Sequence, residues 1–215
     1  MDVERVADGL WRWTTRHPEW VPDDGWDPDV ACVFYEADDA VVLVDPLVPS
    51  EPVERERFLR ALDRDVDRAG LPLSVLLTIF WHERSAAELV ARYGGSLWVH
   101  EPAVPRVESR VTRPFRVGDR LPGGIEPLDA HRRDEVIFWV PAHAALVVGD
   151  ALLGDGHGGI RLPPDDWLQD EMTPEEYRRI LRPLVELPVE RVLLAHGDAV
   201  RADARTALAR ALVDG

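Results

Sequence analysis

The sequence predicts a single α/β domain in which two β-sheets pack face to face and helices cover their outer sides, a four-layer αββα sandwich. β-prone segments separated by turn residues occur in two runs, over residues 3–45 and 115–149, and helical patterns follow each run. A length of 215 residues, with 46% hydrophobic and 30% charged residues, suits one globular domain over residues 1–215 and is short for two.

The expected elements follow from periodicity and from turn residues. Alternating apolar residues predict strands, apolar residues three and four apart predict helices, and Gly, Pro and Asp mark their ends. Residues 101–110 are compatible with a helix or a loop. The expected strands lie in 3–14 (two, around a turn), 30–36, 40–45, 75–78, 97–100, near 115, and at 125–128, 136–140, 145–149 and 191–195; the helices at 54–69, from 85 to about 94, from 173 to about 186, and at 201–213; and the loops at 17–28 and 152–170.

The segment from Ser74 to Leu89 reads as a buried strand, a short polar-aromatic turn and the start of a helix. Ser85 is expected to cap that helix, with Glu88 at capping-box spacing. A second capping box is expected from Thr173 to Glu176. A turn at the carboxyl end of a core strand is a common place for an active site, so residues 79–84 are the first place to look for chemistry.

Charge and cysteine content exclude several classes of protein. The formal net charge of -15 predicts no binding to nucleic acid or to an anionic membrane. All 25 basic residues are arginine, which excludes lysine chemistry such as a Schiff base. The single cysteine, Cys32, rules out a disulfide within the chain and is expected to be a buried, inert thiol. With no signal peptide and no apolar run of about 18 residues, the expected location is the cytoplasm.

Four stretches in order along the chain resemble the metallo-β-lactamase superfamily. They are residues 41–45, 76–78 with the turn that follows, 146–150 and 193–197. The resemblance spans most of the chain and implies an αββα sandwich of the metallo-β-lactamase type. In that family the turn has the form Thr-His-x-His-x-Asp-His. A later His, a Gly-Asp and a terminal His-Gly complete two metal sites.

The turn departs from the family pattern at the positions that bind metal. Thr78 keeps the threonine, but Ile79 and Trp81 stand at the two histidines, Glu83 at the aspartate and Arg84 at the last histidine. Isoleucine and tryptophan cannot ligate a metal, and arginine stays protonated. The degenerate motif therefore predicts that the full dinuclear site is lost.

The later positions of the family pattern are present. His131, Asp150 and His196 match the later histidine, the bridging aspartate and the terminal histidine. The resemblance implies that the first metal site keeps one of its protein ligands and that the second keeps Asp150 and His196. It also implies that Asp45 is a structural hydrogen-bond acceptor.

The predicted pocket residues come from the turn and from these later positions. His82 is one position out of phase with the family's histidines, so it is either a ligand or a hydrogen-bonding residue. Glu83 could bind metal, act as a base, or pair with Arg84 or Arg92. We also expect the Arg84 guanidinium to take the place of the lost metal and pair with Asp150. The full set is Trp81, His82, Glu83, Arg84, His131, Asp150 and His196.

Three hypotheses for function follow, and the sequence leaves open whether the protein is an enzyme. The first is a pseudoenzyme, non-catalytic or weakly active, without a cofactor and with a pocket for a small molecule or partner. The second is a mononuclear hydrolase of an ester, thioester or lactam, with zinc or another divalent metal on His131, Asp150 and His196, helped by His82 or Glu83. The third is a metal-free hydrolase with Glu83 and His196 as acid and base. The sequence does not indicate an oligomeric state.

Overall fold

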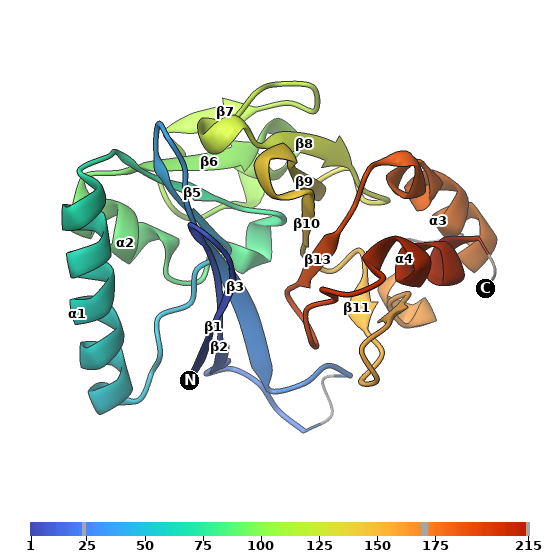
Figure 1. Cartoon of the computed structure of the whole chain (residues 1–215), viewed down its shortest axis with the longest axis horizontal. Coiled ribbons are helices and arrows are strands. Elements are labelled where there is room, and N and C mark those ends of the chain that lie inside the picture. Colours follow the sequence, from blue (N-terminus) through green and yellow to red (C-terminus); the bar gives the residue numbers. More distant parts are fainter. Residues whose placement is uncertain (23–24, 169–171, 214–215) are drawn as a thin grey trace.

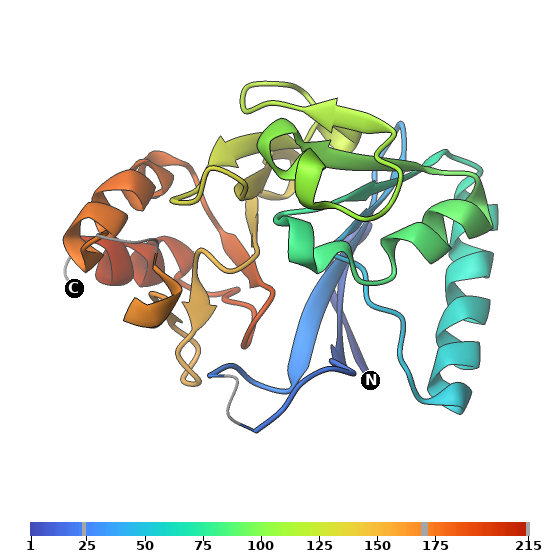
Figure 2. The ribbon, with the colours of Figure 1, turned by 180° about the vertical axis from the view of Figure 1, so that it is seen from behind.

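The computed structural model describes residues 1–22, 25–168 and 172–213 and shows two β-sheets packed face to face with helices on the outside (Figure 1). The view from behind shows the same order of layers (Figure 2). The expected loops at 17–28 and 152–170 each include residues outside the described ranges.

The first sheet contains seven strands in sequence order. Strands β1 to β4 form an antiparallel meander, and β4 to β7 are parallel to one another. Helices α1 (Pro52–Ala69) and α2 (Ala86–Tyr93) lie on its outer face (Figure 1). The strands are β1 (Asp2–Ala7), β2 (Leu10–Arg16), β3 (Asp29–Glu36), β4 (Val41–Val44), β5 (Leu73–Leu76), β6 (Ser96–His100) and β7 (Arg113–Phe115).

The second sheet has four strands in the order β13-β10-β9-β8. Strands β10 and β13 are parallel, whereas β9 is antiparallel to both of its neighbours. Helices α3 (Pro174–Leu181) and α4 (Ala204–Leu212) cover its outer face. The strands are β8 (Glu126–Asp129), β9 (Val136–Val140), β10 (Ala145–Val148) and β13 (Arg191–Leu194).

Three hydrophobic clusters correspond to the three interfaces of a four-layer sandwich. Phe58 and Leu62 of α1 pack on the first sheet, and Leu181 and Leu208 of α3 and α4 pack on the second. The cluster between the sheets includes Phe138, which is fully buried. The αββα prediction is therefore confirmed.

Several local expectations change. Residues 101–106 form a 3-10 helix, and the expected loop at 152–170 contains a small hairpin of β11 (Leu153–Gly154) and β12 (Ile160–Arg161). Ser85 does not cap α2 through its side chain; its hydroxyl accepts a hydrogen bond from the Val48 amide instead. The second expected capping box, at Thr173, is present. None of the described helices is long and apolar enough to cross a bilayer.

The topology brings four strand ends together at one edge of the sandwich. Asp45 follows β4, Thr78 follows β5, Asp150 follows β10 and His196 follows β13. Backbone hydrogen bonds join the sheets at this edge, from Ala31 N to Ala195 O at 2.8 Å and from Val136 N to Thr78 O at 2.9 Å. The side chains that follow these strands therefore face a shared space.

Candidate metal centre

Asp45 organises the first-sheet side of this edge. It has a left-handed backbone conformation, with φ of 49°, and its carboxylate is buried. One oxygen accepts the Thr78 backbone N–H at 2.8 Å, and the other lies 2.9 Å from Nδ1 of His82. These contacts confirm that Asp45 is a structural hydrogen-bond acceptor, and they fix the orientation of the His82 ring.

His82 lies in a 3-10 turn, Phe80–Glu83, and its side chain is 3% exposed. With Nδ1 held by Asp45, Nε2 points at Asp150 and lies 3.2 Å from Oδ1 of that residue. Burial lowers the pKa of His82 and Arg84 lowers it further, but the carboxylates of Asp150 and Asp45 outweigh both and raise it to about 8. His82 therefore sits in a strongly anionic environment.

Asp150 is the central residue of the site. The buried Glu135 carboxylate accepts the backbone N–H groups of Asp150 at 2.9 Å and Ala151 at 2.8 Å and so holds the turn after β10. The Trp81 indole donates to Oδ2 of Asp150 at 2.7 Å. Burial alone would raise the pKa of Asp150, but His82 and His196 hold it well below its usual range.

His196 is positioned by contacts from the first sheet and from the hairpin of β11 and β12. Its backbone carbonyl accepts the Gly154 N–H at 2.9 Å, and the residue forms a bridge with Val30 of β3. The buried Arg12 of β2 donates to the carbonyl of Gly197 in the same turn. These contacts place Nε2 of His196 at 3.2 Å from Oδ1 of Asp150.

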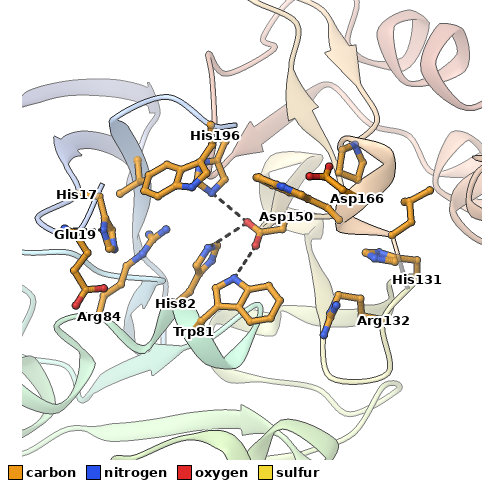
Figure 3. Close-up of a pocket in the computed structure, with 15 residues that line it drawn as sticks. His17, Glu19, Trp81, His82, Arg84, His131, Arg132, Asp150, Asp166 and His196 are labelled. Carbon is orange, nitrogen blue, oxygen red and sulfur yellow. Dashed lines mark hydrogen bonds and ion pairs between the residues drawn. The ribbon is translucent and has the colours of Figure 1, made fainter. Parts of the chain in front are cut away.

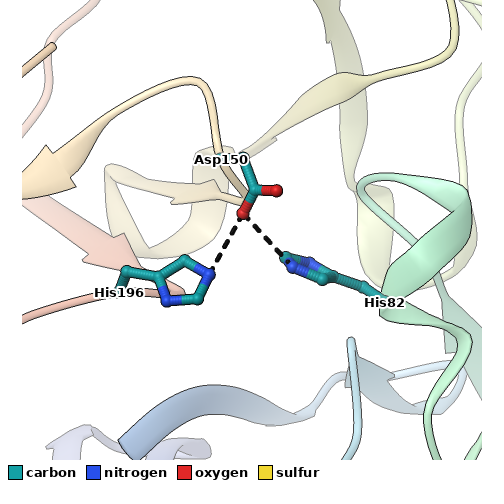
Figure 4. A group of neighbouring side chains, drawn as sticks. All are labelled: His82, Asp150 and His196. Atoms are coloured by element: carbon teal, nitrogen blue, oxygen red, sulfur yellow. Dashed lines mark ion pairs between the residues drawn. The ribbon is translucent and has the colours of Figure 1, made fainter. Parts of the chain in front are cut away.

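The side chains of His82, Asp150 and His196 lie close enough together to hold one metal ion (Figure 4). One ligand atom from each of His82, Asp150 and His196 lies within 4.8 Å of the others, and all three residues are buried. Oδ1 of Asp150 is buried and makes no hydrogen bond of good geometry, although both imidazoles face it. Two imidazoles and a carboxylate are a donor set that divalent zinc and iron accept, so the residues present fit such an ion.

A cavity of about 540 Å³ opens in front of this set (Figure 3). Three tryptophans line it, namely Trp26, Trp81 and Trp167, and two guanidinium groups, from Arg84 and Arg132, also face it. Arg132 lies 4.9 Å from the centre of the Trp81 ring. The carboxylates of Glu19 and Asp166 line it as well, so the cavity combines aromatic walls with charges of both signs beside the candidate ligands.

His131 lines the same cavity but is not part of the ligand set. Its ring packs against Tyr177 at 4.3 Å between ring centres, and both ring nitrogens are buried without a hydrogen-bond partner. Burial and the charge of Arg132 lower the pKa of His131 to about 4, so the ring is neutral. The sequence predicted His131 as the residual ligand, whereas the structure brings His82 to Asp150 and His196.

Two expectations about the turn are corrected. Arg84 makes no ion pair with Asp150 in the described structure; its guanidinium donates to the backbone carbonyl of Asp45 at 3.0 Å. Glu83 does not line the cavity, because its carboxylate accepts the backbone N–H groups of Glu108 and Ser109 at 2.8 and 2.7 Å. This placement removes the geometric basis for an acid–base pair of Glu83 and His196.

Two supporting residues were missed from the sequence. Glu135 holds the Asp150 turn, and Arg12 holds the His196 turn. Each is a charged residue beside or within an apolar β-segment, at a position that becomes buried. A charged residue inside a predicted buried strand is the signal that could have identified Arg12, since such residues are rarely buried without a partner.

Comparison with known proteins identifies the fold. Neither a scan against protein-family models nor a search of curated proteins finds a match. Among solved structures, a metallo-β-lactamase from Pontibacter korlensis is 15% identical with a TM-score of 0.67, covering 100% of this chain and 99% of that one. A β-lactamase domain protein from Burkholderia ambifaria is 20% identical with a TM-score of 0.67, covering 97% of this chain and 71% of that one.

A third similar structure was solved with metal. TTHA1623, in a di-iron-bound form, is 25% identical with a TM-score of 0.63, and the alignment covers 86% of this chain and 95% of that one. These likenesses extend over nearly the whole chain and agree with the strand order and the layered core described above. The chain therefore has the metallo-β-lactamase fold.

Proposed function

We propose that the protein is a metal-dependent hydrolase that holds one divalent ion on His82, Asp150 and His196. The observation that carries this proposal is that three buried residues, from the segments that follow β5, β10 and β13, bring their ligand atoms within 4.8 Å of one another. A buried carboxylate facing two imidazoles is costly unless its charge is balanced, and a cation supplies that balance. This is the mononuclear alternative of the sequence analysis with His82 in place of His131.

The substrate class follows from the resemblance and from the cavity. The resemblance to the metallo-β-lactamase superfamily points to an ester, a thioester or a lactam as the substrate. A divalent ion held by His82, Asp150 and His196 would polarise a carbonyl oxygen and make a bound water more acidic. The aromatic side chains of Trp26 and Trp167 supply apolar walls. The Arg84 guanidinium lines the same cavity without an ion-pair partner in the described structure, and it supplies a positive charge for an anionic substituent.

The chain's own residues hold the centre in place. Asp45 keeps the Nδ1 proton of His82 and leaves Nε2 free to face the ligand space, an arrangement that orients metal-binding histidines in proteins. Trp81 holds Oδ2 of Asp150 and leaves Oδ1 toward the two imidazoles. Neutral His131 lines the cavity, but both of its ring nitrogens are buried, so it contributes to the shape of the wall.

The similar protein solved in a di-iron-bound form supports metal binding in this fold. In the described part of the present chain, one group of three candidate ligands is present. Ile79 lies in the core at 1% exposure and Trp81 carries an indole, so neither adds a ligand. We therefore propose one ion and not two.

A metal-free binding protein is the second candidate, and one observation favours it. Trp81 already donates a hydrogen bond to Asp150, which stabilises the carboxylate without a cation. In this case the aromatic cavity binds a small molecule and catalyses no reaction, as the pseudoenzyme hypothesis states. The two candidates differ in whether the purified protein contains metal.

Metal analysis of protein purified without chelator separates these candidates. We expect about one zinc, iron or manganese ion per chain, lost in His82→Ala and in His196→Ala. His157→Ala, on an exposed loop, is the matched control and keeps the ion. The metal-loaded protein hydrolyses members of an ester, thioester and lactam panel, and chelation abolishes this activity. Metal-free protein that takes up none of these ions on addition would exclude the proposed function and leave the second candidate.

A further inference from the structure

A second cavity of about 540 Å³ lies on the outer face of the first sheet, between strands β1 and β2 and helix α1. It shares no lining residue with the cavity at the candidate metal centre. Figure 1 shows α1 beside this part of the sheet, with α3 and α4 on the far side of the molecule. We refer to this cavity as the α1 groove.

Apolar side chains form the α1 groove. Its floor includes Trp13, Phe34 and Phe58, which are 3–8% exposed. Its wall includes Trp11 and Val3, which are 37% and 51% exposed. Seven large hydrophobic side chains in the described structure are exposed, and three of them, Met1, Val3 and Trp11, line this one groove, which favours a binding surface here.

Arginines form the rim of the groove. Arg57, Arg60, Arg64 and Arg68 all lie on α1 and all line it. Arg60 pairs with Glu56, and Arg68 pairs with Glu36 and Asp65. Within the described structure, Arg57 and Arg64 have no ion-pair partner; they are seven residues apart and therefore lie on the same face of the helix.

The charge of the rim is opposite to that of the protein. The formal net charge is -15, yet four guanidinium groups and a single carboxylate, that of Asp65, line the groove. Arg68 lies between two carboxylates, those of Glu36 at 2.6 Å and Asp65 at 3.6 Å, so the positive charge of the rim comes from Arg57 and Arg64. The field at this groove favours an anion, and a guanidinium binds a carboxylate through two parallel hydrogen bonds.

We propose that the α1 groove binds a free organic anion with a linear apolar chain, of the medium-chain carboxylate class. The volume lies within the range of small-molecule sites. The apolar chain lies against Trp11, Phe34 and Phe58, and the carboxylate is bound by Arg57 and Arg64. This site is separate from the candidate metal centre and does not depend on the proposed function.

Calorimetric titration of the full chain with decanoate, below its micelle concentration, tests this proposal. We expect saturable binding of about one decanoate per chain. Decanol, which lacks the charge, and decyltrimethylammonium, which reverses it, bind at least about tenfold more weakly. Decanoate also changes the tryptophan fluorescence of the wild type, and the change is smaller in Trp11→Phe, because the ligand contacts Trp11 as well as Trp13.

Two variants and a matched control locate the site. Arg57→Gln/Arg64→Gln weakens decanoate binding at least about tenfold, whereas Arg110→Gln/Arg113→Gln, the same charge change at exposed positions outside the groove, leaves it unchanged. Val3→Asp places a carboxylate at an exposed position of the wall and abolishes binding. Far-UV circular dichroism confirms that each variant is folded.

Three results would overturn the proposal. The first is no saturable binding of decanoate up to about 1 mM, a concentration that detects even weak complexes. The second is equal affinity for decanoate and decyltrimethylammonium, which would remove the role of the arginines. The third is a concentration-dependent dimer that Val3→Asp dissociates and decanoate does not, which would show that a second copy of the chain covers the groove.

Discussion

The carboxylate of Glu135 is 0% exposed and accepts two backbone N–H groups from the turn that carries Asp150. Glu135→Ala removes this acceptor and leaves both N–H groups buried without a partner. We expect a loss of about 2–4 kcal/mol of unfolding free energy, measured in urea. If Asp150 binds metal, the affinity for zinc also falls at least about tenfold, because the ligand is no longer held in place.

Glu135→Gln tests whether Glu135 acts by accepting hydrogen bonds from the Asp150 turn or by its negative charge. Its amide oxygen can still accept the N–H groups of Asp150 and Ala151, so we expect it to recover most of the stability and of the zinc affinity. Glu190→Ala, at an exposed carboxylate, is the control and changes neither quantity. Zinc affinity that is equal in Glu135→Ala and the wild type would contradict a positioning role.

Cys32 is buried at 1% exposure in β3, and its sulfur accepts the Leu47 N–H at 3.2 Å. Burial raises the pKa of this thiol to about 11, so at pH 8 the reactive thiolate is almost absent. We expect native protein not to react with a coloured disulfide reagent at pH 8, and unfolded protein to release about one equivalent. A rapid reaction of the folded protein would contradict the expectation of a buried, inert thiol.

The sequence predicted Asp150, His196 and His82 as pocket residues, and the structure places all three near one another. The sequence left open whether His82 is a ligand or a hydrogen-bonding residue. Matching Ile79 and Trp81 to the family's His-x-His assumes an extended turn, in which side chains two residues apart point the same way. The turn is a 3-10 helix over Phe80–Glu83, with about three residues per turn, so alternation does not decide which side chain faces Asp150. Asp45, which is distant in sequence, fixes the His82 ring.

Among the elements, the turn after β13 depends on one glycine. Gly197 has φ of 90°, and a Cβ at this position would lie 2.8 Å from the Gly154 Cα. Gly197→Ala therefore meets both backbone strain and a steric clash. We expect a loss of about 2–4 kcal/mol of unfolding free energy, measured in urea, with displacement of the adjacent His196.

Gly156→Ala is the matched control for this change. Gly156 also has positive φ, 77°, but nothing lies within 4 Å of a Cβ built there. It therefore reports the backbone strain alone, of about 1 kcal/mol. Equal destabilisation by the two variants would show that the contact between the β11 and β13 turns does not constrain the His196 position.

Capping residues show what local sequence can predict at the scale of an element. Thr173 and Glu176 form the expected capping box at the start of α3, because both partners lie within one helical turn. Ser85 has the same spacing to Glu88, but its hydroxyl accepts the Val48 N–H at 2.9 Å from a distant segment. The local pattern therefore predicts a cap at Ser85 that a tertiary contact prevents.

For the whole molecule, the order of strands and helices predicted two sheets with helices outside, but not how the strands are shared between the sheets. All strands up to β7 join one sheet, whereas β8 to β10 and β13 join the other. The parallel pairing of β10 with β13 connects segments separated by α3, and spacing alone does not predict such long-range pairing. The clusters of buried residues, in contrast, follow directly from the apolar faces of the predicted elements.

The cluster between the sheets predicts that the chain unfolds as one unit, as expected for a single domain. Phe138 of β9 is fully buried in this cluster and lies 6.0 Å from the Phe115 ring of the first sheet. We expect Phe138→Ala to lower the unfolding free energy by about 3–5 kcal/mol, with far-UV dichroism and tryptophan fluorescence changing in one coincident transition. Leu208→Ala, on the inner face of α4 in the outer cluster, is the comparison and should lower the unfolding free energy of the same single transition. Two separate transitions, only one of which shifts in Leu208→Ala, would show that the halves fold as independent domains.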